Sequence, residues 1–175
     1  RLFGEKKNTG TKVEFLLIKR IQGDLWQTMV RPGRRIKPGD VIVFGPGLSA
    51  TVNDFGEQGT RLGTCSYQGI FMERLEEYGT MPLPPYIERP ATNADNDRYQ
   101  TVYCEPEGSV AAPTAGLHFT NELLHKIREK GISTAYVTLH VGIGTFRPVK
   151  AETVEEHEMH YEEYEISEEA ALLIN

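Results

Sequence analysis

Three prolines within four residues divide this chain into two halves of different character. Pro82, Pro84 and Pro85 remove backbone donors and fix φ, so neither a helix nor a central strand can run through them. The stretch 88–97, rich in Pro, Asn and Asp, continues the irregular segment. We therefore predict a domain boundary here, with one domain at residues 1–90 and a second at residues 91–175.

The first half has the pattern of a small antiparallel β-domain. Short apolar stretches alternate with turn residues at 22–24, 38–39 and 56–59. We expect 12–19 to pair with 25–31 as a hairpin, and 41–44, 48–52 and 60–67 to follow as strands. This spacing predicts a small barrel or sandwich. Residues 70–78 instead have helical periodicity, which predicts a helix ending at Gly79.

The second half has an α/β pattern. We predict a short strand at 100–104, a helix that begins after the N-cap Thr120 and ends at Gly131, and a strand at 132–141. The chain begins inside a predicted strand and stops inside a predicted helix at 170–175, as expected for a piece of a longer chain.

Composition excludes several classes of protein. Charged residues make up 25% and hydrophobic residues 39% of the chain, as in globular domains rather than disordered segments. Apolar runs stay far short of the roughly 20 residues of a membrane helix, and no secretory signal is recognisable. Cys65 and Cys104 are too few for a disulfide framework, and we expect both to be small buried residues. A cytoplasmic protein without a membrane segment is expected.

Charge is distributed unevenly along the chain. Residues 1–40 hold ten Lys or Arg against four acidic residues, a net charge of +6 in a chain of −6. Residues 151–175 hold nine Glu and no Lys or Arg. A locally basic face can bind a polyanion on a globally acidic protein, because screening limits the range of each charge. A solvated surface with some clustering explains the same pattern, so charge alone does not decide the function.

Two glycine-containing loops carry the densest chemical signal. In the first, at 110–120, small residues lead through Gly116 to His118 directly before a helix, so backbone N–H groups can approach a ligand. In the second, at 139–148, a strand ends at His140 and continues into Gly142 and Gly144. The second loop lacks the third glycine of the dinucleotide fingerprint. Purely structural loops remain the alternative at both places.

A histidine pair and a basic turn complete the candidates. His157 and His160 fail the spacing of a zinc helix, which needs a ligand four residues after the first, where Tyr161 stands; we expect no metal site. Four cations surround the Pro-Gly pairs at 32–33 and 38–39 and could grip phosphates, although a solvated turn is the alternative. These cations are Arg31, Arg34, Arg35 and Lys37.

Taken together, these segments resemble the S-adenosylmethionine:tRNA ribosyltransferase-isomerase family of queuosine biosynthesis. The resemblance rests on residues 1–4, 30–34, 81–87, 99–103, 108–120, 136–149 and 157–160. It implies an α+β fold of two domains, in which an antiparallel β-barrel module is inserted into an α/β sandwich domain. It also implies that N-terminal and C-terminal portions of the family chain are absent here.

The resemblance further implies a tRNA-modifying transferase-isomerase. Such an enzyme transfers and isomerises the ribosyl moiety of S-adenosylmethionine onto 7-aminomethyl-7-deazaguanine at the tRNA wobble position. The product is epoxyqueuosine, and adenine and methionine are released. S-adenosylmethionine is then a co-substrate, with no permanently bound cofactor, and a monomer is expected. The competing interpretations are a non-catalytic RNA-binding β module and an S-adenosylmethionine-dependent methyltransferase.

On this resemblance each candidate residue acquires an expected role. His118 and His140, with His160 behind them, are the candidate acid–base catalysts, because histidine titrates near neutrality. The basic turn, with Arg31, Arg34, Arg35 and Lys37, is the candidate tRNA contact. The candidate substrate-binding residues are Pro113, Thr114, Ala115, Gly116, Gly142, Gly144, Thr145, Phe146 and Arg147, of which the last could hold a carboxylate or a phosphate.

Overall fold

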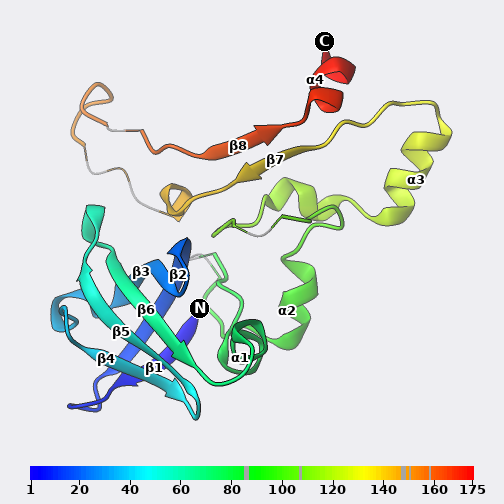
Figure 1. Ribbon diagram of the computed structural model, residues 1–175. Helices are drawn as coiled ribbons and strands as arrows, with labels where there is room; N and C mark the ends of the chain where they lie inside the picture. The colour runs from blue at the N-terminus through cyan, green and yellow to red at the C-terminus, as the bar shows by residue number, and fades with distance from the viewer. Residues whose placement is uncertain (85–86, 107, 147–148, 150, 158) are drawn as a thin grey trace. The chain divides into compact units, whose positions relative to one another are not determined.

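The chain forms two compact units, Arg1–Pro82 and Leu83–Asn175, and their boundary lies in the proline-rich segment (Figure 1). The structure is a computed structural model, and it describes residues 1–84, 87–106, 108–146, 149, 151–157 and 159–175. Among the helices formed by these residues, none has both the length and the apolar character needed to cross a bilayer.

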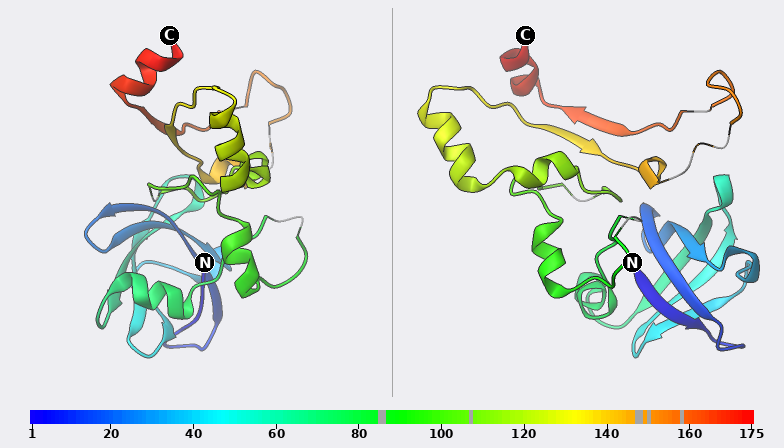
Figure 2. Two further views of the ribbon diagram at one scale, coloured as in Figure 1. Left: turned by 90° about the vertical axis from the view of Figure 1, so that its right-hand side faces the viewer. Right: turned by 180° about the vertical axis from the view of Figure 1, so that it is seen from behind.

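The first unit is a closed antiparallel barrel of six strands, which is one of the two architectures that the sequence pattern predicts. Neighbouring strands follow the order β1-β2-β3-β6-β5-β4, and β4 closes the barrel by pairing with β1 (Figure 2). The strands are β1 Leu2–Lys6, β2 Lys12–Gln22, β3 Leu25–Arg31, β4 Val41–Gly45, β5 Leu48–Phe55 and β6 Arg61–Tyr67.

The barrel interior is filled by alternate residues of each strand, because successive side chains point to opposite faces. Phe15 is fully buried and packs edge-on against Phe44, with ring centroids 5.3 Å apart. Gly63 faces this ring, and a Cβ there would lie 3.1 Å from Cζ of Phe15. The other buried apolar residues of this core are Leu2, Val13, Val30, Ile36, Ile42, Leu48, Ala50, Val52, Cys65 and Phe71.

The predicted turns and helix of the first half are present. Gly23 and Gly39 have φ values of 54° and 89°, which glycine adopts without strain, at two of the turns that the sequence indicates. Helix α1 (Phe71–Tyr78) follows the barrel, and Phe71 packs on Tyr67 and Trp26 with ring centroids 5.1 and 5.7 Å apart. The helix ends at Gly79, whose N–H donates to the carbonyl of Leu75.

The second unit combines short helices with a two-stranded antiparallel sheet, so the chain as a whole has α+β character. Strands β7 (Val137–His140) and β8 (Glu163–Ile166) pair from Val137 opposite Ile166 to His140 opposite Glu163. The helices are α2 Asn93–Arg98, α3 Asn121–Glu129 and α4 Glu168–Ile174. Short 3₁₀ turns are η1 Gly33–Arg35 and η2 Glu57–Gly59 in the first unit, and η3 Thr114–His118 and η4 Ile143–Phe146 in the second.

Several predictions for the second half are wrong. Residues 100–104 form a turn rather than a strand, closed by a 3.2 Å bond from the Cys104 N–H to the Thr101 carbonyl. Cys104 is exposed, whereas Cys65 is buried as predicted. The strand predicted at 132–141 covers only 137–140, because only these residues pair with β8. Helix α3 is confirmed, and the Thr120 hydroxyl accepts a 3.1 Å bond from the Leu123 N–H.

The segment predicted as irregular at 88–97 contains α2, which a capping box begins. The Asp95 carboxylate accepts bonds from the Thr92 N–H and hydroxyl, at 2.7 and 2.9 Å. The Arg89 guanidinium donates to both oxygens of the same carboxylate, each at 2.7 Å. Arg89 and then the Thr92 N–H hold the pKa of the buried Asp95 carboxyl well below its ordinary value.

Candidate functional site

The first glycine loop is attached to the strand that ends at His140. The Val110 N–H donates to the Val141 carbonyl at 2.8 Å. The Ser109 hydroxyl donates to the Leu139 carbonyl at 3.3 Å and accepts from the Val141 N–H at 3.1 Å. Residues 108–110, which lead into this loop, therefore run along 139–141, and two motifs about 30 residues apart form one local structure.

Gly108 covers one side of the His140 ring. Its φ of 146° lies in a region that other residues rarely adopt, and a Cβ there would lie 2.5 Å from Nδ1 of His140. The Nδ1 atom is shielded from solvent and has no hydrogen-bond partner among the described residues. Since the residue as a whole is only half-buried, Nε2 is the ring nitrogen that can exchange a proton with a ligand.

His118 lies at the end of η3 and is exposed. Upstream of it, Gly116 is buried against Thr101 and Tyr103, where a Cβ would collide with the Tyr103 hydroxyl. The Tyr103 ring also meets Phe119 edge-on, with centroids 6.4 Å apart. These contacts fix the turn that carries His118. In the part of the chain that the structure describes, the His118 side chain has no hydrogen bond or ion pair.

The second glycine loop receives His160. A Cβ on Gly144 would lie 2.5 Å from Cδ2 of the His160 ring, so only glycine allows this approach. The rings of His157 and His160 meet edge-on at 6.4 Å between centroids. The Gly142 N–H is already used, because it donates to Oε1 of Glu162 at 3.1 Å. This carboxylate therefore occupies the backbone N–H of a residue that the resemblance assigns to substrate binding.

The structure describes all but one of the remaining predicted substrate-binding residues. Pro113, Thr114, Ala115 and Thr145 are exposed, and the first three belong to the η3 loop or directly precede it. The Phe146 backbone ends η4. Arg147 lies outside the described residues. Among the described residues no group of three or more His, Cys, Asp or Glu side chains is arranged to hold a metal ion.

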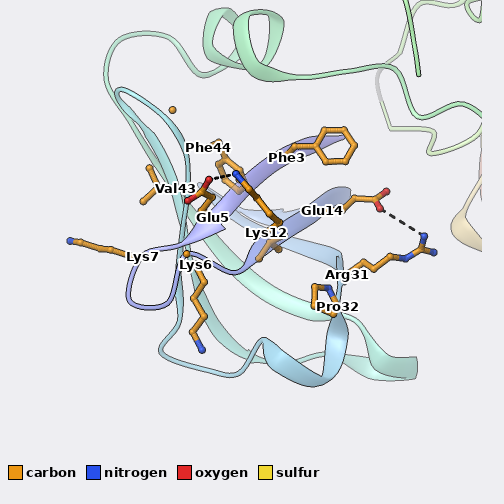
Figure 3. A pocket seen from close by; sticks show the side chains of 14 residues that line it. Phe3, Glu5, Lys6, Lys7, Lys12, Glu14, Arg31, Pro32, Val43 and Phe44 are labelled. Atoms are coloured by element: carbon orange, nitrogen blue, oxygen red, sulfur yellow. Dashed lines mark hydrogen bonds and ion pairs between the residues drawn. The ribbon is translucent and has the colours of Figure 1, made fainter. Parts of the chain in front are cut away.

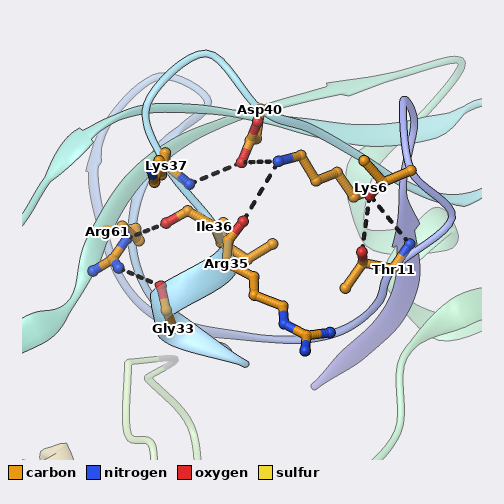
Figure 4. A network of polar contacts seen from close by, with 9 residues as sticks. Lys6, Thr11, Gly33, Arg35, Ile36, Lys37, Asp40 and Arg61 are labelled. Atoms are coloured by element: carbon orange, nitrogen blue, oxygen red, sulfur yellow. Dashed lines mark hydrogen bonds and ion pairs between the residues drawn. The ribbon is translucent and has the colours of Figure 1, made fainter.

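The basic turn lies in the barrel unit and has a rigid frame. Arg31, Arg34, Arg35 and Lys37 are all exposed. Their backbone is fixed from inside by Arg61, whose buried guanidinium donates only to carbonyl oxygens (Figure 4). The acceptors and distances are Gly33 at 2.7 Å, Thr60 at 2.8 Å, Gly59 at 3.0 Å and Ile36 at 3.1 Å.

A second anchor holds the other side of this turn. Nζ of Lys6 lies 2.8 Å from Oδ2 of Asp40 and 3.4 Å from the Arg35 carbonyl, and the Lys37 N–H donates to Asp40 at 2.8 Å (Figure 4). Partial burial acts to raise the pKa of Asp40, but the Lys6 ammonium and the Lys37 N–H outweigh it and the pKa lies below its ordinary value. Arg34 and Arg35 have no ion pair within the described residues, so their charges face solvent uncompensated.

Some residues of these sites are not recognisable from sequence. Arg61 resembles any strand arginine, and Ser109 and Glu162 have no motif around them. Their contacts depend on how separate segments meet, which no local pattern specifies. For Gly108 the available signal is its place two residues before the small-residue loop.

Comparison with known proteins connects these features to one family. The family model described as queuosine biosynthesis protein matches residues 1–175. Among solved structures, the chain is similar to S-adenosylmethionine tRNA ribosyltransferase from Thermotoga maritima, with 31% sequence identity and a TM-score of 0.39. The match covers 81% of this chain and 36% of that protein, so the chain spans about a third of the length of this solved relative.

Proposed function

Because the chain belongs to the queuosine biosynthesis protein family, we propose that it is part of an enzyme that transfers a ribosyl group from S-adenosylmethionine to tRNA. The family match over all 175 residues carries this proposal, and the name of the relative from Thermotoga maritima supports the donor and the acceptor. The acceptor is 7-aminomethyl-7-deazaguanine at the wobble position, and the products are epoxyqueuosine in tRNA, adenine and methionine. The barrel is then a module inserted into an α/β sandwich domain.

The proposed chemistry requires an acid–base group of near-neutral pKa. The sulfonium of the donor acidifies the adjacent ribose carbon, so a positioned base can remove a proton there, and the aminomethyl group acts as the nucleophile toward the ribose. His140 suits this role, because Gly108 shields Nδ1 and leaves Nε2 for proton exchange. His118 and His160 are the further candidates, the latter seated on Gly144.

Substrate binding is assigned to the two glycine loops and tRNA binding to the basic turn. Residues 113–116, 142 and 144–147 would line the donor site. Arg31, Arg34, Arg35 and Lys37 would contact phosphates. The anchoring of their backbone by Arg61 and Lys6 supports this, because an already ordered turn loses little conformational freedom on binding. A monomer and a cytoplasmic location stay predictions from the sequence.

Separate labels in the donor test the reaction. The protein is given S-adenosylmethionine labelled in the ribose or in the methyl group, with tRNA that carries the aminomethyl base. Ribose label should enter tRNA as free adenine appears, and His140→Ala and His118→Ala should reduce turnover by about 10²–10⁴-fold. Methyl label in tRNA would indicate a methyltransferase, and tRNA binding without transfer of either label would indicate a non-catalytic RNA-binding module.

A further inference from the structure

A cleft of about 760 Å³ lies along β1, between β2 and β4, on the barrel unit (Figure 3). It is distinct from the histidine loops, which belong to the second unit. Its lining combines exposed apolar side chains, chiefly Phe3 and Val43, with four cations and two carboxylates. The cations are Lys6, Lys7, Lys12 and Arg31, and the carboxylates are Glu5 and Glu14.

Strand register arranges these side chains in two parallel rows across the barrel surface. In one row Val43 on β4 is opposite Glu5 on β1, which is opposite Lys12 on β2. In the other, Phe3 on β1 is opposite Glu14 on β2, which is opposite Arg31 on β3. Both rows therefore run from an apolar side chain through a carboxylate to a cation. The apolar and cationic ends are two strand spacings apart, roughly 9–10 Å.

Phe3 is an unusual side chain for the outer surface of a barrel. It is 53% exposed, and Val43 on the neighbouring strand is 39% exposed. Figure 3 shows the Phe3 ring extending from the strand, away from the ion pair of Lys12 and Glu5. An exposed aromatic ring in a cleft offers a flat surface for another ring to stack on.

The cations beside this ring are available to an incoming anion. Lys12 pairs with Glu5, and Nη1 of Arg31 is 4.0 Å from Oε2 of Glu14, which Arg1 also contacts at 3.0 Å. The Lys12 and Arg31 side chains are 85% and 84% exposed, and exposed ion pairs of this kind stabilise little. A phosphate can therefore compete with the carboxylates for these two cations. In the described part of the chain Lys7 has no ion pair at all.

We propose that this cleft binds an unpaired stretch of RNA, with one base stacked on Phe3 and the flanking phosphates contacted by Lys12 and Arg31. The proposal deepens the proposed function and rests on it for the RNA, which is the tRNA substrate. Arg31 lines the cleft and also begins the basic turn, so the two sites share this residue. The chemistry favours unpaired RNA over a duplex, because a paired base has no free face to stack.

A protein partner fits this surface less well. The core of a protein–protein interface is depleted of charged residues. Here four of the six positions in the two rows are charged, two of them carboxylates and two of them cations. An RNA strand, with rings and phosphates in regular succession, matches a surface on which an aromatic ring and cations are neighbours.

Fluorescence anisotropy with two labelled RNAs tests the proposal. One probe is a stem-loop with the anticodon loop of the tRNA, and the other is a fully paired duplex of the same stem. Phe3→Ala should weaken binding of the stem-loop roughly 5- to 150-fold and leave duplex binding unchanged. Ile21→Ala is the matched control, because Ile21 is 49% exposed on β2 and does not line the cleft. Wild-type affinity of Phe3→Ala for the stem-loop, or an equal loss for both probes, would overturn the proposal.

Salt dependence and crosslinking give two further readouts. Lys12→Gln should lower the slope of log K against log salt for the stem-loop by roughly 0.7. Photocrosslinking of wild-type protein to loop thiouridine should label the tryptic peptide of residues 2–6, which contains Phe3, because trypsin cleaves after Arg1 and Lys6. An unchanged slope together with crosslinks confined to other peptides would refute RNA binding in the cleft. Because the crosslinking uses wild-type protein, this readout does not depend on the folding of a variant.

The same preparations separate this proposal from the proposed function. Ribosyl transfer by the wild-type protein, with stem-loop binding that does not depend on Phe3, would refute RNA binding in the cleft and leave the proposed function standing. Binding that depends on Phe3, without any ribosyl transfer to tRNA, would support the cleft and refute the proposed function.

Discussion

Replacing Arg61 by methionine should lower the free energy of unfolding of the barrel unit by about 3 kcal/mol. The guanidinium donates four hydrogen bonds to backbone carbonyls and also lies 4.6 Å from the centre of the Phe55 ring. The bonds to Ile36 and Thr60 are fully buried, whereas those to Gly33 and Gly59 are partly buried. A hydrogen bond with one charged partner contributes about 1.5–3 kcal/mol, so the two buried bonds at the lower limit give the estimate.

This loss is large compared with the stability of the unit. A domain of the size of Arg1–Pro82 is stable by roughly 4–12 kcal/mol at about 0.05–0.15 kcal/mol per residue. One kcal/mol shifts Tm by about 4–8 °C in domains of this size, so the Tm of the variant should fall by roughly 12–24 °C.

Urea denaturation followed by tryptophan fluorescence measures the effect. Trp26 is the single tryptophan of the chain and lies on β3, so its emission reports on the barrel unit alone. Arg61→Lys keeps the charge but has fewer donors and should give an intermediate loss. Arg34→Met, at an exposed position of the turn that Arg61 anchors, should stay within about 0.5 kcal/mol of wild type. If Arg61→Met also stayed within that range, the carbonyls would be equally well satisfied by water and the reasoning would be wrong.

Further predictions concern the second unit and the thiols. Arg89 and Thr92 lower the folded pKa of Asp95, so the stability that this carboxylate contributes is complete above the unfolded pKa near 4 and is lost as pH falls through the folded value. Asp95→Asn should therefore flatten the acid side of a pH–stability profile followed by circular dichroism, and an unchanged profile would contradict this. Burial and then Asp24 raise the pKa of Cys65 to about 12, so a thiol reagent at neutral pH should modify Cys104 alone in native protein and both cysteines after unfolding. Gly108→Ala should displace His140 and reduce turnover far more than Gly131→Ala does. The control also replaces a glycine of positive φ, but this glycine has open space around it, so equal effects would exclude a role for the contact with His140.

The sequence predicts the barrel where neighbouring strands pair through short turns. Gly23 and Gly39 mark two turns correctly, and alternation in β5 places Leu48, Ala50 and Val52 inside. Barrel closure depends on β1 meeting β4 and β3 meeting β6. These strands are distant in sequence, and local periodicity contains no information about such partners.

Predictions for the second half fail where a local pattern needs a distant partner. The strand pattern at 132–141 extends further than β7, because pairing is limited to the four residues that β8 can reach. The candidate histidines are recognisable from their loops, but the contacts of Gly108 with His140 and of Gly144 with His160 arise from tertiary folding. The capping box of Thr92 and Asp95 is recognisable in the sequence, because the two residues have the spacing that begins a helix. The prediction of an irregular segment at 88–97 overlooks this signal.

Strand order also divides the barrel into two three-stranded meanders, β1-β2-β3 and β4-β5-β6, that the segment 32–40 joins. Hairpins within a meander form in about 1–10 μs. The two seams between the meanders are the strand pairs β1–β4 and β3–β6. Their formation requires the closure of longer loops, so it sets the folding time. At one seam the Thr28 hydroxyl donates to the Arg61 carbonyl at 3.2 Å. Since the connecting segment contains the basic turn, RNA bound there would hold the meanders together, and amide hydrogen exchange along both seams should slow when RNA binds.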